Sequence, residues 1–296
     1  MTNPVAGPIE PEAHSEIRAE KIEFSILTAA VIILGLGYFI RGRFESKASQ
    51  TFLLLPIAFL FTSHIRYMNQ VEGRSFRRLL PYSLALWSAT WLIEAAGVWS
   101  GLYHYEKTVL GALRLGPVPL LIPCIWVLFG WLAASIVHFL WGRGAGRSAD
   151  LPLPAESLAT AWVLVSMAFA IEWHFSRLIG LWNWSPVGGG WTINGVPAVN
   201  FLFWFVVGLI SPSLQRLGRA PRIEYRTSSA FLQCLPVLGF GLVLAFTAGL
   251  NVVRGFAGAG ALCASSVIVL GIALAVRSRR RAERPFNNPR PNTRIA

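Results

Sequence analysis

The chain has 296 residues, of which 54% are hydrophobic and only 14% are charged, and its mean hydropathy is +0.53. Soluble domains carry about a quarter charged residues, so this composition indicates a membrane protein. The formal net charge is +12, but the lysines and arginines lie beside long apolar runs and form no basic stripe on a soluble segment. Such a pattern is typical of loops that face anionic lipid, and it excludes nucleic acid as an expected partner.

Apolar runs divide the chain into a mobile N-terminal tail at 1–20, a single transmembrane helical domain at 21–276 and a basic C-terminal tail at 277–296. A helix needs about 20 apolar residues to cross a bilayer, so the runs predict an all-α, polytopic bundle of about eight spans. The sixth run is short and the eighth is rich in glycine, which leaves seven spans as the alternative. The predicted spans lie at 22–40, 51–68, 80–100, 119–141, 158–179, 197–211, 230–250 and 256–276.

Basic residues predict the orientation in the membrane. With the N-terminus inside, 19 of the 26 lysines and arginines lie on inner segments and seven lie on outer loops. The positive-inside rule therefore places both termini in the cytoplasm, with the chain in the inner cell membrane. Loops 101–118 and 180–196 would then face outward.

Two stretches of the chain resemble each other at a fixed offset. Gly-Leu-Tyr-His-Tyr at 101–105 corresponds to Gly-Leu-Trp-Asn-Trp at 180–184, at an offset of 79. Self-similarity of this kind indicates a duplicated unit, here two helix–loop–helix units at about 82–141 and 158–211. Both units would cross the membrane in the same direction, and such a parallel repeat predicts a site between the halves. Three further residues recur 78 positions later: Glu94 as Glu172, Pro119 as Pro197 and Trp126 as Trp204.

Glu94 and Glu172 are the acidic residues that lie well inside predicted spans. A charge is costly there, so an intramembrane acid is by default a candidate functional group. A carboxylic acid that stays protonated in apolar surroundings can act as a general acid. The structural alternative is a hydrogen bond between helices, or an ion pair between Glu172 and Arg177.

Aromatic residues accompany both acids. Helical spacing places Trp87 and Trp91 on the face of Glu94, and Phe169 on the face of Glu172. Flat aromatic faces suit a polyene ligand and can stabilise a carbocation, whereas the alternative for the loop aromatics is an interfacial belt. Asn200 lies one turn before Trp204, where it would position a water molecule or bond a neighbouring helix. The candidate substrate-binding residues are Trp87, Trp91, Tyr103, Tyr105, Trp126, Phe169, Trp182, Trp184 and Trp204, and the candidate catalytic residues are Glu94, Glu172 and Asn200.

Common cofactor motifs are absent from the sequence. Asp150 is the single aspartate, so the aspartate-rich motifs that hold magnesium on a pyrophosphate are missing. There is no GxGxxG motif after a strand and no P-loop. We therefore expect chemistry that needs no metal, nucleotide or redox cofactor. His64 and His138 lie near the inner ends of predicted spans, where a haem held by the pair is a weaker interpretation than two structural histidines.

The motifs around the two acids resemble a known family. Glu94 with Gly-Leu-Tyr-His-Tyr and the Pro-Val-Pro-Leu-Leu-Ile-Pro-Cys-Ile-Trp stretch at 117–126 is one resembling part. Gly-Leu-Trp-Asn-Trp with Gly-Val-Pro-Ala-Val-Asn-Phe-Leu-Phe-Trp at 195–204 is the other. Together they are similar to the carotenoid biosynthesis membrane family typified by the carotenoid 1′,2′-hydratases, which include bisanhydrobacterioruberin hydratases. The resemblance covers about 94–126 and 171–204.

This resemblance implies a hydratase that adds water to a terminal carbon–carbon double bond of an acyclic or monocyclic carotenoid. One of the two glutamates would protonate the double bond, and the second carboxylate with Asn200 would hold the water. The alternatives are another carotenoid-modifying enzyme, such as an isomerase or cyclase, or a non-enzymatic carrier of lipid or pigment. Membrane lipid, the carotenoid substrate and other enzymes of its pathway are the expected partners.

Overall fold

The computed structural model describes residues 62, 64–106, 113–141, 151–173, 176, 182–185, 191–218, 223 and 230–282. The predicted N-terminal tail, the predicted span at 22–40, most of the span at 51–68 and most of the C-terminal tail lie outside the described residues. A helical segment occupies 64–70. The long helices are α3 (Phe76–Trp99), α4 (Leu121–Trp141), α5 (Leu153–Trp173), α6 (Ala198–Leu217), α7 (Ala230–Val253) and α8 (Ala257–Ala282).

The described helices confirm a mostly helical, membrane-embedded protein. Five of them, α4 to α8, are long and apolar enough to cross a membrane. α3 is also long but is not among these five, and it carries Glu94 together with several hydroxyl side chains. The sixth predicted span, 197–211, is longer than expected, since α6 continues to Leu217. The total of eight or seven spans includes residues outside the described part and stays a prediction.

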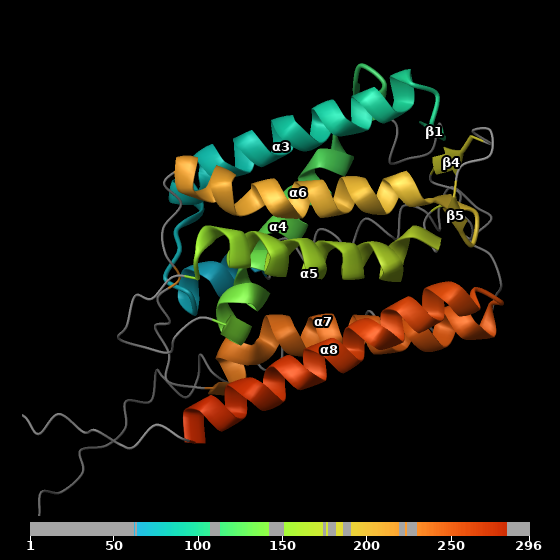
Figure 1. Ribbon diagram of the computed structural model, residues 1–296. Helices are drawn as coiled ribbons and strands as arrows, with labels where there is room; N and C mark the ends of the chain where they lie inside the picture. Colours follow the sequence, from blue (N-terminus) through green and yellow to red (C-terminus); the bar gives the residue numbers. More distant parts are fainter. Residues whose placement is uncertain are drawn as a thin grey trace, which may run out of the picture.

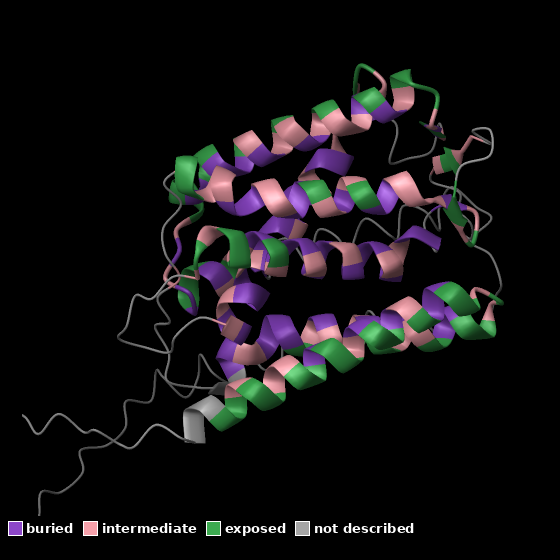
Figure 2. Cartoon of the chain, in the orientation of Figure 1, coloured by how far each residue is buried: buried purple, intermediate pink, exposed green. Residues whose placement is uncertain are grey.

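Helices α3 to α6 lie side by side, and α7 and α8 form a hairpin along one side of α4 and α5 (Figure 1). α4 is the most buried of the five apolar helices. The outer face of α8 carries exposed apolar residues such as Ile268 and Ile272 (Figure 2). An apolar outer surface is expected where helices meet lipid.

Short strands at one end of the bundle are a feature that the all-α prediction lacked (Figure 1). β2 and β3 form one hairpin, β5 and β6 form another, and β1 pairs with β4 antiparallel. Two- and three-residue strands are too short to show an alternating sequence pattern. The Asn194-Gly195 turn, with both φ angles positive, is nevertheless a strong local hairpin signal. The strands are β1 (Tyr103–Tyr105), β2 (Arg114–Leu115), β3 (Val118–Pro119), β4 (Trp182–Trp184), β5 (Thr192–Ile193) and β6 (Val196–Pro197).

The two proposed units share details of geometry. The hairpins have the same register 78 positions apart, since Arg114 pairs with Pro119 as Thr192 pairs with Pro197. In the β1–β4 ribbon the corresponding residues His104 and Asn183 lie opposite each other, with Tyr103 opposite Trp184 and Tyr105 opposite Trp182. A local two-fold axis between β1 and β4 would produce this register.

Glycines 78 positions apart mark the helix crossings of the two units. A Cβ atom on Gly208 of α6 would lie 2.3 Å from the Cα atom of Ala161 on α5. A Cβ atom on Gly130 of α4 would lie 2.4 Å from Cδ2 of Leu86 on α3. In both units, therefore, a glycine lets the second helix approach the first closely.

Candidate active site

Glu94 lies near the C-terminal end of α3 and is surrounded by hydrogen-bond donors. Trp126 Nε1 donates to its Oε1 at 2.7 Å, and the Tyr105 hydroxyl donates to its Oε2 at 2.5 Å. The Tyr103 hydroxyl donates to the same Oε2. An ionised carboxylate accepts all three bonds, and the Tyr103 hydroxyl also lies 3.1 Å from the Glu94 backbone carbonyl oxygen, to which it can donate. The surroundings of Glu94 therefore suit an anion.

The two tyrosines are held in place by their neighbours. Their rings meet edge to face, with centroids 5.5 Å apart. A Cβ atom on Gly97 would lie 2.5 Å from the Tyr103 ring, so the absence of a side chain there makes room for the ring. Burial and the Glu94 carboxylate raise the pKa of Tyr103 and of Tyr105 above the ordinary value. Both phenols therefore remain protonated donors.

Glu172 has fewer partners. Its side chain on α5 is 3% exposed, and Trp204 Nε1 donates to its Oε1 at 3.1 Å. Its Oε2 is buried without a hydrogen-bond partner in the described part of the chain, as is Nδ2 of Asn200. Asn200 and Trp182 lie close enough to interact with the Glu172 carboxyl group, although Asn200 Nδ2 makes no well-formed bond. Glu172 thus has an oxygen free to carry a proton, beside an amide free to donate.

A pair of tryptophans joins the two acids. The rings of Trp126 and Trp204 lie 4.1 Å apart at 42°, and each indole donates to the acid of its own unit. Glu94 and Glu172 also interact electrostatically. The structure therefore places both carboxyl groups in one cluster.

The other predicted aromatic residues divide into two groups. Near the acids, Trp184 packs on Tyr103 at 4.9 Å and Trp182 on Tyr105 at 6.3 Å. Phe169 packs on Phe201 at 5.1 Å. Farther away, Trp91 donates to the Leu115 carbonyl oxygen at 3.1 Å, and Trp87 packs against the core. No hydrogen bond or ring contact of the described residues brings Trp87 or Trp91 to either carboxyl group.

Some features of the site were missing from the sequence interpretation. The hydroxyls of Tyr103 and Tyr105 bind Glu94, a role that the sequence does not indicate, and substrate binding by the two rings stays a prediction. Phe201 packs between Phe169 and Trp173, and no motif in the sequence marks it as part of the site. The alternative ion pair of Glu172 involves Arg177, which lies outside the described residues. Among the described residues, no group of three or more histidine, cysteine or acidic side chains is placed to hold a metal ion.

A family model described as carotenoid biosynthesis protein matches residues 50–272. The chain belongs to the carotenoid biosynthesis protein family. The match covers α3 to α7, all the strands and both carboxyl groups, so the family predicted from the motifs is confirmed. For this carotenoid biosynthesis protein, comparisons with curated proteins and with solved structures gave no match.

Proposed function

We propose that the protein is a hydratase that adds water to a terminal double bond of an acyclic or monocyclic carotenoid by acid catalysis. The observation that carries this proposal is the unequal bonding of the two acids. Glu94 accepts three hydrogen bonds, whereas Glu172 keeps a buried oxygen that has no hydrogen-bond partner among the described residues. One group is thus suited to remain an anion and the other to hold and transfer a proton.

In the proposed reaction Glu172 Oε2 gives its proton to the inner, hydrogen-bearing carbon of the terminal double bond, next to the outer carbon that carries the two methyl groups. A new C–H bond forms, the π bond breaks, and a tertiary carbocation remains on the neighbouring carbon. Water held by Asn200 Nδ2 then adds to this cation, and the second water proton returns to the Glu172 carboxylate. The product is a tertiary alcohol, and the acid is restored without any other reactant.

Glu94 would act through its charge. A fixed anion close to the developing carbocation lowers the energy of the transition state, because its position is set before the reaction begins. The aromatic faces nearby add cation–π stabilisation. Tyr103, Tyr105 and Trp126 would then serve as positioning residues, since they hold Glu94 in its ionised form.

The proposal includes the duplication and the membrane orientation. Two parallel units related by an axis along the membrane normal would bring both acids to the outer end of the bundle. The equal registers of the two hairpins and the crossing glycines Gly130 and Gly208 support such units. Both termini would lie in the cytoplasm, in the cell membrane, with lipid, the carotenoid and other enzymes of its pathway as partners and without a cofactor.

Two alternatives are less well supported. An isomerase or cyclase would use the same acid but lose a proton, so it would have no use for the unpaired Asn200 amide beside Glu172. A carrier would need access from both ends of the bundle. Below the tryptophan pair, however, Leu86 and Val207 are almost fully buried, and Leu86 packs against Gly130. This packing favours a site that opens only toward the strands.

Expression in a bacterium that accumulates lycopene, followed by mass analysis of the pigments, tests the proposal. The unaltered chain should add the mass of one water per reacted end. Glu172→Gln keeps the size of the side chain but cannot release a proton to an alkene, so it should lower the rate by a factor of about 10²–10⁴.

The matched control is Glu156→Gln, at the other end of α5, where Glu156 pairs with Arg216. It should hydrate at the normal rate. Normal hydration by Glu172→Gln would contradict the mechanism.

A further inference from the structure

The outer face of α3 carries exposed side chains that lie four residues apart, which we call the α3 ridge. Leu84 is 57% exposed and Leu92 is 58% exposed, and Ser88 between them is exposed as well. Side chains at this spacing form a continuous ridge, and such ridges pack into the grooves of a neighbouring helix. The spacing continues toward both ends of the helix, with exposed residues at Phe76, Leu80 and Ala96.

The corresponding ridge of α5 is covered by the α7–α8 hairpin. Ser166, which lies 78 positions after Ser88, is 1% exposed, and its hydroxyl donates to Ser266 Oγ of α8 at 2.9 Å. Trp162, one turn earlier, packs against Phe240 of α7 with the ring centroids 6.0 Å apart. The α5 ridge is therefore a contact between helices, and it includes a pair of serine hydroxyls.

The α3 ridge keeps the serine but lacks the covering helices among the described residues. Ser83 and Thr90 of the same helix are buried and donate to carbonyl oxygens of α3. The exposed Ser88 hydroxyl makes no hydrogen bond within the described part of the chain. Lipid tails offer no hydrogen-bond partner, and polar side chains in membrane helices often bond to a neighbouring helix. The ridge therefore suits a helix that brings a hydroxyl group to Ser88.

The position of α3 in the bundle also favours protein over lipid at this face. Of the described helices, the five that are apolar enough to cross a membrane do not include α3, yet α3 lies at the edge of the bundle (Figure 1). A helix with several hydroxyl side chains is stabilised in a membrane where another helix packs on it. The sequence of α3 is thus better suited to a place between helices than to a lipid-facing edge.

A second copy of the chain provides the required helix. A serine hydroxyl is both donor and acceptor, so two Ser88 side chains can bond to each other across a two-fold axis, as Ser166 and Ser266 do within one chain. Copies inserted in the same direction place Ser88 at equal depth, with Leu84 and Leu92 of both copies around the pair. A contact of this kind closes after two copies, so it forms a dimer and not an open chain.

We propose that the α3 ridge is a dimer interface of this protein in the membrane, with Ser88 bonded to Ser88 of the partner subunit. Each α3 would then be packed on both sides, which would hold the helix that carries Glu94. The dimer keeps one site in each copy, and the inference does not depend on the proposed reaction.

Oxidative cross-linking in native membranes tests the contact. Ser88→Cys places two thiols where the helices approach most closely, so a disulfide-linked dimer should appear on a gel without reductant. The matched control is Ile272→Cys on the outer face of α8, where the side chain is 58% exposed. It should stay monomeric, as should the unaltered chain with its three cysteines.

Two results of the cross-linking would overturn the proposal. The absence of a Ser88→Cys dimer would show that lipid, or a segment outside the described residues, covers the ridge. Equal cross-linking of Ser88→Cys and Ile272→Cys would show random collision in the membrane.

Energy transfer between fluorescent proteins fused to the C-terminus measures the dimer in lipid vesicles. Ser88→Ala removes the hydroxyl and should weaken the dimer about threefold, the effect of one hydrogen bond between membrane helices. Ser88→Leu adds bulk at the crossing and should weaken it about tenfold. Both changes lie on an exposed position of the single chain, so its own core is undisturbed. Ile272→Ala should leave the dimer unchanged, and a dimer that neither Ser88 variant weakens would place the interface elsewhere and overturn the proposal.

Discussion

In the first of the two proposed units Glu94 accepts hydrogen bonds from Tyr103, Tyr105 and Trp126, whereas in the second, among the described residues, Glu172 accepts a well-formed bond from Trp204. The tryptophan is common to both units. The tyrosines are not, because the corresponding strand of the second unit carries tryptophans at 182 and 184. The two tyrosine side chains thus account for the difference between Glu94, both of whose carboxylate oxygens accept hydrogen bonds, and Glu172, whose Oε2 has no partner among the described residues. In the proposed mechanism, therefore, the neighbouring hydrogen-bond donors, and not the acids themselves, divide the roles of the two acids.

The largest expected effect separates the two acids. Glu172→Gln should slow hydration by a factor of about 10²–10⁴. Glu94→Gln should slow hydration by a factor of about 10–100. The amide NH₂ group of glutamine would face hydrogen-bond donors, and losing a hydrogen bond to the charged carboxylate costs about 1.5–3 kcal/mol. Initial rates from pigment mass analysis measure both. Equal losses would remove the proposed division between acid and anion.

Removing the two tyrosine hydroxyl groups should make the hydrogen bonding of Glu94 resemble that of Glu172. Tyr103→Phe and Tyr105→Phe each delete one hydrogen bond to the Glu94 carboxylate and should lower kcat by about tenfold. Tyr67→Phe is the matched control, since its hydroxyl bonds Gln233 at the opposite end of the bundle. If both site variants keep the normal kcat, the tyrosines do not act through Glu94.

The crossing glycines should differ in their effect on stability. In Gly208→Ala the new Cβ atom meets the backbone of Ala161, so the helices must separate, at a cost of about 1–3 kcal/mol. In Gly130→Ala the new Cβ atom meets only the ends of the Leu86 and Tyr82 side chains, which can move. Alanine also stabilises the helix by about 1 kcal/mol relative to glycine. Thermal unfolding in detergent should therefore show the lower Tm for Gly208→Ala. The opposite order would be evidence against a tighter crossing in the second unit.

The smallest effect concerns alkaline pH. Tyr103 and Tyr105 have folded-state pKa values above the ordinary 10.0. Their contribution to stability is complete below pH 10. Above pH 10 the unfolded chain loses these protons and the folded chain does not, so the contribution falls as the pH rises toward the folded pKa values. Denaturant titrations should show a steeper loss above pH 10 for the unaltered chain than for the Tyr103→Phe, Tyr105→Phe double variant.

Part of this site could be predicted from the sequence because its signals are local. Glu94 and Glu172 are conspicuous as acids in apolar spans, and their offset of 78 residues indicated paired units. The same offset relates Gly130 to Gly208. The direction of the tyrosine hydroxyls could not be predicted, because it depends on the β1–β4 ribbon and on the space beside Gly97.

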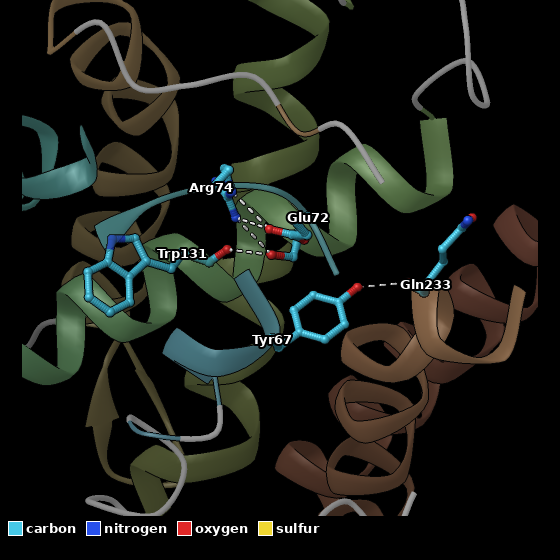
Figure 3. Close-up of polar contacts among 6 residues, drawn as sticks. Tyr67, Glu72, Arg74, Trp131 and Gln233 are labelled. Carbon is cyan, nitrogen blue, oxygen red and sulfur yellow. Dashed lines mark hydrogen bonds and ion pairs between the residues drawn. The ribbon is translucent and has the colours of Figure 1, made fainter. Parts of the chain in front are cut away.

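The buried pair of Glu72 and Arg74 (Figure 3) shows why counting charges in the sequence has limits. In the sequence Arg74 is one of the basic residues of an inner segment, and it supports the positive-inside orientation. In the structure it is buried with Glu72 against Ser135. That burial arises from packing between the turn, the helical segment at 64–70 and α4, which are separated in the sequence. A tertiary contact of this kind leaves no periodic pattern.

The register of the β1–β4 ribbon bears on how such a protein could have arisen. Each strand pairs with its own counterpart, so two copies of one half-length chain could form the same ribbon across a two-fold axis, as in an isologous homodimer. Such a dimer would already have both acids and both stacked tryptophans in one shared site, but with identical surroundings. Fusion of the two genes would then have been the step that allowed Tyr103 and Tyr105 to differ from Trp182 and Trp184. On this history, an asymmetric catalyst evolved from a symmetric one through changes beside the acids, while the acids themselves stayed the same.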